Sequence, residues 1–145
     1  MTSRAAAITA LASTLSGAYA WTTPVSTKLK MISDVGKSER PACFVFESGT
    51  EKYEWKNGAV PNRHVPVKLF IYTGSPDQET SDASVQDAIL DAIDAAFSLR
   101  SQESVLGRHT LGGAVYNCRI MDVFKVPGDI NGDGMIIVNI TLTLP

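Results

Sequence analysis

The stretch VPVKLFIYTGSPD, residues 65–77, and the stretch SDASVQDAILDAIDAAFSL, residues 81–99, together decide the fold class. The first has apolar side chains at every second position, the period of a β-strand: Val65, Val67, Leu69 and Ile71. The second has them at the i, i+3, i+4, i+7 spacing of a helix: Val85, Ala88, Ile89, Ala92, Ile93, Ala96 and Phe97. We expect the helix to begin at a cap formed by Thr80 or Ser81 and to pack this stripe on a sheet.

Two more strands are expected after this helix, joined as a C-terminal hairpin over residues 114–144. The strand at residues 114–126 is predicted to place four side chains on one face: Tyr116, Cys118, Ile120 and Phe124. The strand at residues 135–144 alternates without interruption: Ile136, Val138, Ile140, Leu142 and Leu144. The polar residues 127–134 connect the two strands.

Two shorter strands are expected before residue 65. Residues 42–47 are mostly apolar on both faces, which predicts a strand in the middle of the sheet. Residues 28–35 are interpreted as a short strand with Leu29 and Met31 pointing inward.

The chain opens with a predicted amphipathic helix over residues 3–16. Its apolar residues share one face: Ile8, Leu11 and Leu15. Thr2 or Ser3 is expected to cap this helix, and Gly17 to end it. The alternative interpretation of residues 1–20 is a secretory signal peptide, because the segment has an early arginine and ends in Ala18-Tyr19-Ala20.

These elements predict one α+β domain that spans residues 1–145. The expected architecture is a single twisted, mostly antiparallel sheet of about five strands with two helices packed on one face. A hydrophobic fraction of 44% and a charged fraction of 19% are ordinary for a globular domain. No stretch approaches the ~20 apolar residues that a membrane-spanning helix needs, so no membrane association is predicted.

Residues 48–64 form a long polar connection that carries Tyr53 and Trp55. A short hairpin that turns at Asn57-Gly58 is possible here, because this residue pair tolerates positive φ. Exposed aromatic residues on a long loop are typical of a contact with a partner protein. The alternative is that Trp55 folds back on the domain as a small satellite core.

Charge is unevenly distributed along the chain. Residues 77–103 contain seven acids and one base, whereas the other residues contain eight acids and twelve bases. Four of the acids lie on the predicted helix: Asp82, Asp87, Asp91 and Asp94. Such a chain can stack acidic on basic surface between copies or partners. A solvated helix face opposite a scattered basic surface explains the same pattern.

The sequence offers one weak candidate for a metal site. Asp129, Asn131 and Asp133 match the first positions of an EF-hand calcium loop, but Ile140 stands where the bidentate glutamate is needed. A hairpin turn is therefore the favoured interpretation, and we predict no cofactor.

No catalytic residue and no enzymatic activity are predicted. The histidines, His64 and His109, are expected in loops, and a nucleophilic pair of His109 with Cys118 has little support. Cys43 and Cys118 lie in apolar runs, which is typical of buried reduced thiols.

Six segments, in this order, resemble the tail terminator (tail completion) proteins of long-tailed bacteriophages: residues 4–12, 41–47, 65–72, 85–93, 115–120 and 135–142. The resemblance implies a virion protein, assembled in the host cytoplasm, whose copies form a homohexameric ring. It implies that the ring caps the tail tube, binds the tail tube protein and docks on the head-side connector or head completion protein. Genome DNA would pass through the lumen without sequence-specific binding, and the acidic helix face is a candidate lining.

Three other functions remain open from the sequence. The first is another phage neck or minor tail protein of similar fold. The second is a secreted binding domain with a cleaved signal peptide and a disulfide between Cys43 and Cys118. The third is a small hydrolase that uses Cys118 or a serine.

Overall fold

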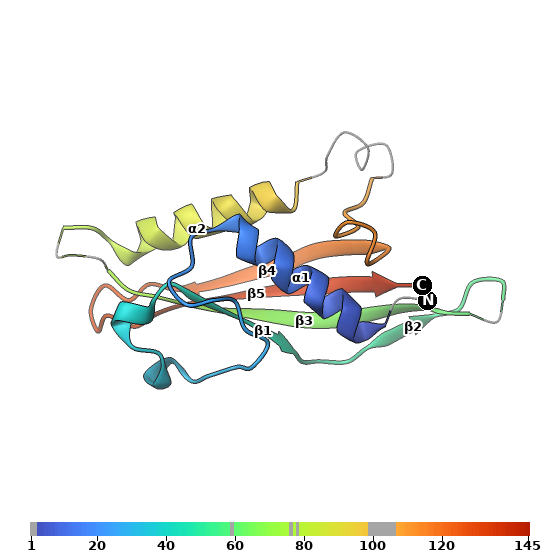
Figure 1. The fold of residues 1–145 in the computed structure, drawn as a ribbon, viewed down its shortest axis with the longest axis horizontal. Coiled ribbons are helices and arrows are strands. Elements are labelled where there is room, and N and C mark those ends of the chain that lie inside the picture. The colour runs from blue at the N-terminus through green and yellow to red at the C-terminus, as the bar shows by residue number, and fades with distance from the viewer. Residues whose placement is uncertain (1–2, 59, 76, 78, 99–106) are drawn as a thin grey trace.

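The computed structural model describes residues 3–58, 60–75, 77, 79–98 and 107–145. Two α-helices, two short 3-10 turns and five strands follow one another (Figure 1): α1 (Arg4–Ala18), η1 (Ile32–Asp34), η2 (Lys37–Glu39), β1 (Ala42–Glu47), β2 (Lys52–Glu54), β3 (Asn62–Thr73), α2 (Asp82–Ala96), β4 (Asn117–Val126) and β5 (Gly134–Leu144). No helix in the described part of the chain is long and apolar enough to cross a membrane.

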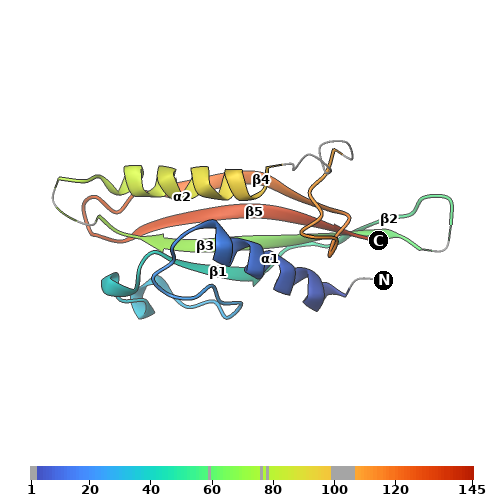
Figure 2. The ribbon, with the colours of Figure 1, turned by 45° about the horizontal axis from the view of Figure 1, so that its top comes forward.

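The five strands form one antiparallel sheet in the order β1-β3-β5-β4, with β2 paired to the first residues of β3. The two longest strands, β3 and β5, are neighbours at the centre, in register from Arg63 opposite Leu144 to Thr73 opposite Gly134. Both helices lie on the same face of the sheet (Figures 1 and 2). The α+β architecture predicted from the sequence is confirmed.

The main core lies between the helices and this face of the sheet. The alternating apolar residues predicted for β3 and β5 are buried there, and so are four residues of α1: Ala7, Ile8, Leu11 and Leu15. Ser3 caps α1, because its Oγ accepts a hydrogen bond from the backbone nitrogen of Ala6. The predicted amphipathic helix is thus confirmed, although it continues through Gly17 and ends at Ala18.

The expectation of a strand at residues 28–35 is wrong. The segment contains the turn η1, and Met31 is 70% exposed. The segment instead covers part of the second face of the sheet, where Leu29 and Val35 pack on Phe44 and Tyr72. This cover explains why both faces of β1 are apolar. The inference that β1 is a central strand was wrong, because β1 lies at an edge with apolar neighbours on both of its faces.

The buried side of α2 is rotated from the predicted stripe. Asp82, Gln86, Ile89 and Ile93 are buried, whereas Ala88 is exposed. Asp82 and Gln86 lie on the inner face because their side chains form hydrogen bonds with residues at the ends of β3 and β4. The periodicity of apolar residues does not reveal such bonds. Ser81 caps the helix, as predicted, and Leu99, where we expected the helix to end, lies outside the described residues.

A β-bulge at residue 121 changes the faces of β4. The register shifts between Ile120 and Asp122, so Phe124 pairs with Ile137 and lies opposite the face that holds Cys118 and Ile120. The prediction that Phe124 shares a face with Cys118 was therefore wrong. An inserted residue reverses the alternation beyond it.

We expect the substitution Leu69→Ala to lower the free energy of unfolding by about 2–5 kcal/mol, because it opens a cavity in the middle of the core. Leu69 is 0% exposed on the central strand β3. Urea denaturation of the purified chain measures the change. The matched control is Ile130→Ala at a fully exposed loop position, expected to change the value by less than about 0.5 kcal/mol. Equal losses in the two variants would contradict the assignment of this core.

Candidate assembly surfaces

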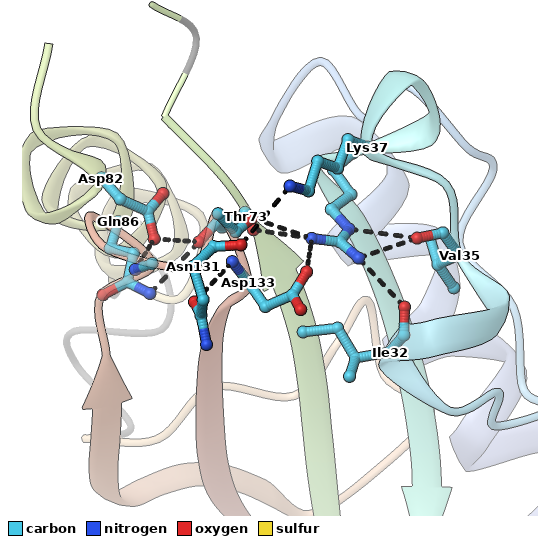
Figure 3. Close-up of polar contacts among 11 residues, drawn as sticks. Ile32, Val35, Lys37, Thr73, Asp82, Gln86, Asn131 and Asp133 are labelled. Atoms are coloured by element: carbon cyan, nitrogen blue, oxygen red, sulfur yellow. Dashed lines mark hydrogen bonds and ion pairs between the residues drawn. The ribbon is translucent and has the colours of Figure 1, made fainter. Parts of the chain in front are cut away.

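A buried arginine, Arg40, joins the segment before β1, the end of β3 and the loop between β4 and β5; Figure 3 labels one bonded residue of each, Ile32, Thr73 and Asp133. The Arg40 side chain is only 5% exposed, and it forms an ion pair of 2.7 Å with Asp133. Its guanidinium also donates hydrogen bonds to backbone oxygens of Ile32, Val35 and Gly132, at 2.9 to 3.2 Å. The segment before β1 is thereby fixed to the loop between β4 and β5.

Asp82 lies in the same region and does not belong to the solvent-exposed acidic face. It is 0% exposed, and its Oδ2 accepts hydrogen bonds from Thr73 Oγ1 at 2.9 Å and from the Gly128 backbone at 2.6 Å. Gln86, one turn later, donates to Thr73 Oγ1 and to the Val126 carbonyl. The first turn of α2 is thus bonded to the ends of β3 and β4. We call the five residues Arg40, Thr73, Asp82, Gln86 and Asp133 the polar joint.

The weak calcium candidate is a structured turn whose side chains have separate partners. Asp129 Oδ1 accepts from the backbone nitrogen of Asp82 at 2.6 Å, and Asn131 Oδ1 accepts from that of Asp133. Asp133 itself pairs with Arg40. The described residues contain no group of three or more histidine, cysteine or carboxylate side chains placed to hold a metal ion.

The hairpin formed by β2 and β3 projects at the other end of the sheet (Figure 2). Its turn uses Asn57 at φ 44°, as the sequence indicated. Tyr53 is 52% exposed and Trp55 is 64% exposed, so Trp55 does not fold back into a satellite core. Arg4 of α1 braces the hairpin, since it donates to the Tyr53 hydroxyl at 2.9 Å. Both aromatic rings are presented to solvent.

Two ionisable groups order the base of this hairpin. His64 Nε2 lies 3.1 Å from Glu54 Oε2, and Nδ1 of the same ring lies 3.1 Å from Thr143 Oγ1. The hydrogen bonds from His64 and from Lys56 lower the pKa of the Glu54 carboxyl. His64 therefore has a structural contact here, on a strand and not in the loop that we expected.

Three of the four predicted acidic residues of α2 are exposed on one side of the helix. Asp87 pairs with Lys125 of β4 at 2.8 Å, which places this side next to β4. Asp91 and Asp94 are exposed on the same side, at helical spacing from Asp87. The expected exposure is found for these three residues and is wrong for Asp82, while their place at an interface stays a prediction.

Strand β4 is an edge strand with exposed apolar side chains. It has β5 on one side and no partner strand on the other among the described residues. Four apolar residues at and after the bulge are 41% to 58% exposed: Met121, Val123, Phe124 and Val126. Register places Val123 on the helix-bearing face and Phe124 on the opposite face. Both faces of this edge are thus apolar and open to solvent, which sequence periodicity did not indicate because of the bulge.

The face of the sheet without helices carries a continuous apolar row. Phe44, Phe70, Ile137 and Phe124 are cross-strand neighbours from β1 to β4. The segment before β1 covers Phe44, but Phe70 and Ile137 remain partly exposed. The row therefore continues the apolar surface of the β4 edge toward the centre of the sheet.

The two cysteines are free, buried and far apart, and Cys118 lies next to His109, whose carbonyl accepts from the Cys118 backbone nitrogen at 2.8 Å. Burial raises the pKa of each thiol to about 12. Cys43 is on β1 and Cys118 on β4, with two strands between them, too far apart for a disulfide. A protonated thiol is a poor nucleophile, so the pairing of Cys118 with His109 gains no support. The disulfide of the secreted-domain alternative does not fit this sheet order.

No protein-family model matches this sequence, and no curated protein shows significant similarity to it.

Replacing Arg40 by methionine is expected to lower the free energy of unfolding by about 2–4 kcal/mol, because buried acceptors and the Asp133 carboxylate lose their donor. The matched control is Arg4→Met, which breaks an ion pair of the same 2.7 Å length in which both side chains are about a third exposed. Its loss should be much smaller. Urea denaturation measures both. A similar effect of the two substitutions would contradict a stabilising role for the polar joint.

Cys43 and Cys118 are expected to resist alkylation by iodoacetamide at pH 8 in the native chain and to react after unfolding without reductant. Because the folded pKa of each thiol is raised, their protonated form stabilises the fold fully below about pH 9, and this contribution falls as pH rises toward 12. Intact mass spectrometry counts the labels. Failure of the unfolded, unreduced chain to take two labels would contradict free thiols.

Proposed function

We propose that this chain is a structural virion protein, a tail terminator of a long-tailed bacteriophage. In this proposal its copies form a ring of six subunits, in keeping with the resemblance, that caps the tail tube and stops its elongation. The same ring joins the tail to the head-side connector, and genome DNA passes through its lumen without sequence-specific contacts.

The observation that carries the proposal is the open apolar edge of β4. Edge strands of proteins that remain monomeric are normally short, charged or covered, because an open edge pairs with other chains. Strand β4 has ten residues and, although it contains a bulge and three charged residues, Val123 and Phe124 expose apolar side chains on both of its faces. An edge of this kind is suited to a contact with another chain.

The arrangement of elements also supports the proposal. The segments that resemble tail terminators lie in α1, β1, β3, α2, β4 and β5, apart from residues 41, 115 and 116. Asp82 is buried, so only Asp87, Asp91 and Asp94 remain available to a lumen or an interface.

The test is an assembly assay with purified tail tube protein. We expect the added chain to bind tube ends and to stop elongation, with ring-shaped particles of about six copies on those ends in negative-stain images. The substitution Phe124→Ser should weaken capping, since it removes an apolar ring from the open edge, whereas Met31→Ser, at an exposed site far from β4, should not. Tubes that elongate normally in the presence of the wild-type chain would reject the proposal.

A further inference from the structure

The sheet has two open edges, and they differ in chemistry. Strand β4 forms one edge, and β1 and β2 share the other. The outer edge of β1 is already occupied: the Ser26 nitrogen donates to Cys43, and its carbonyl accepts from Val45. In the described part of the chain this leaves β2, in the projecting hairpin, as the open strand opposite β4.

The β4 edge combines apolar and acidic side chains. Met121, Val123 and Phe124 are exposed along the strand; Val123 shares the helix-bearing face with the acidic side of α2, and Phe124 lies on the opposite face. We call this surface the β4 flank: Asp87, Asp91, Asp94, Met121, Val123, Phe124 and Val126. Two basic residues of β4 adjoin this surface: Lys125, which is paired with Asp87, and Arg119, which is exposed.

The hairpin has the complementary chemistry. Residues 52–63 contain three basic side chains and one acidic side chain. The aromatic rings of Tyr53 and Trp55 are more than half exposed between Lys52 and Lys56. Exposed aromatic residues flanked by basic side chains fit a surface of apolar residues bordered by carboxylates.

We propose that the β2–β3 hairpin of one copy of this chain docks on the β4 flank of the next copy. The inference rests on the proposed function and specifies the contact between subunits. The two surfaces lie on opposite edges of one sheet, so the contact is heterologous, and repeating it generates a closed ring if the rotation between copies closes. Trp55 packs on the apolar residues of β4, while Lys52 and Lys56 face Asp91 and Asp94.

A symmetric contact between two β4 edges is disfavoured by charge. It would bring the acidic sides of two α2 helices together, with Asp87, Asp91 and Asp94 repeated on both sides of the interface. Like charges placed opposite one another across an interface oppose association. In the head-to-tail contact the carboxylates face the neighbouring hairpin and not the lumen, in contrast to the lining considered from the sequence.

Reciprocal charge reversal tests the contact. The variant K52E/K56E makes both surfaces acidic, and D91K/D94K makes both basic, so each variant alone should fail to associate. An equimolar mixture should associate again, because each reversed surface meets its complement on the other variant. Sedimentation velocity measures association of the chain alone and in the presence of purified tail tubes, since a ring can also close on a tube.

The control for net charge is K28E/K30E, which changes two exposed lysines of the segment before β1 and should associate like the wild-type chain. The variant W55A gives an independent test. We expect it to weaken self-association by at least about tenfold, because Trp55 is the aromatic residue buried at the proposed interface. Its control is M31A, at another exposed apolar residue, with no expected effect. Circular dichroism verifies that each variant is folded.

The outcomes separate the two proposals. Restored association in the mixture, with K28E/K30E unaffected, supports the hairpin contact. Association of K52E/K56E alone, a mixture that remains monomeric, or a wild-type chain that associates in neither setting overturns it. If association is lost in each variant and recovered in the mixture, but tail tubes remain uncapped, the tail terminator function is rejected and the contact is supported. Capped tubes that tolerate both variants reject the contact alone.

Discussion

The antiparallel ladder between β3 and β5 is the interaction on which the rest of the structure depends. It extends from Arg63 opposite Leu144 to Thr73 opposite Gly134. Both strands bury alternate side chains under the helices, so a shift of one residue would turn every buried side chain to the other face. The register is therefore fixed, and so are the two ends of the ladder. The polar joint forms at the Thr73 end, and the β2–β3 hairpin extends from the Arg63 end.

The parts that could be predicted from the sequence are those in which burial follows one period. The alternation in β3 and β5 and the apolar side of α1 predicted the α+β fold correctly, because each of these elements buries one face in one core. Where two constraints act at once, periodicity failed. The bulge at residue 121 reversed the faces of β4, Asp82 and Gln86 are buried by hydrogen bonds to distant strand ends, and β1 is covered on both faces although it is an edge. The bulge, the buried polar residues and the cover of β1 all arise from contacts with residues distant in the sequence, so a local pattern does not predict them.

The two ends of the molecule differ in exposure: the polar joint is buried, and the hairpin, which we propose to contact a partner, is open to solvent. At the polar joint, charged groups are buried or bonded to backbone groups, and Arg40 alone connects the segment before β1, the end of β3 and the loop between β4 and β5. Such contacts fix loops and leave little for a partner to bind. At the hairpin, Trp55 and Lys56 are exposed, and the ion pair of Lys56 with Glu54 is open to solvent. A partner that covers these residues displaces water without breaking the fold. Of the candidate residues named from the sequence, Asp82 and Asp133 therefore belong to the polar joint, Tyr53 and Trp55 to the hairpin, and Asp87, Asp91 and Asp94 to the exposed side of α2.

In the proposed assembly, the β4 edge keeps exposed apolar side chains and still avoids pairing with the same edge of another copy. Its bulge and its charged residues are features that usually prevent edge strands from pairing. Here the charge of Lys125, next to Phe124, is balanced by Asp87, whereas Arg119 is exposed on the other side of the bulge. The carboxylates of α2 stand beside this edge on every copy. They repel the same edge of another copy and attract a basic surface, so the charge pattern selects the orientation of the partner while apolar contact supplies the affinity.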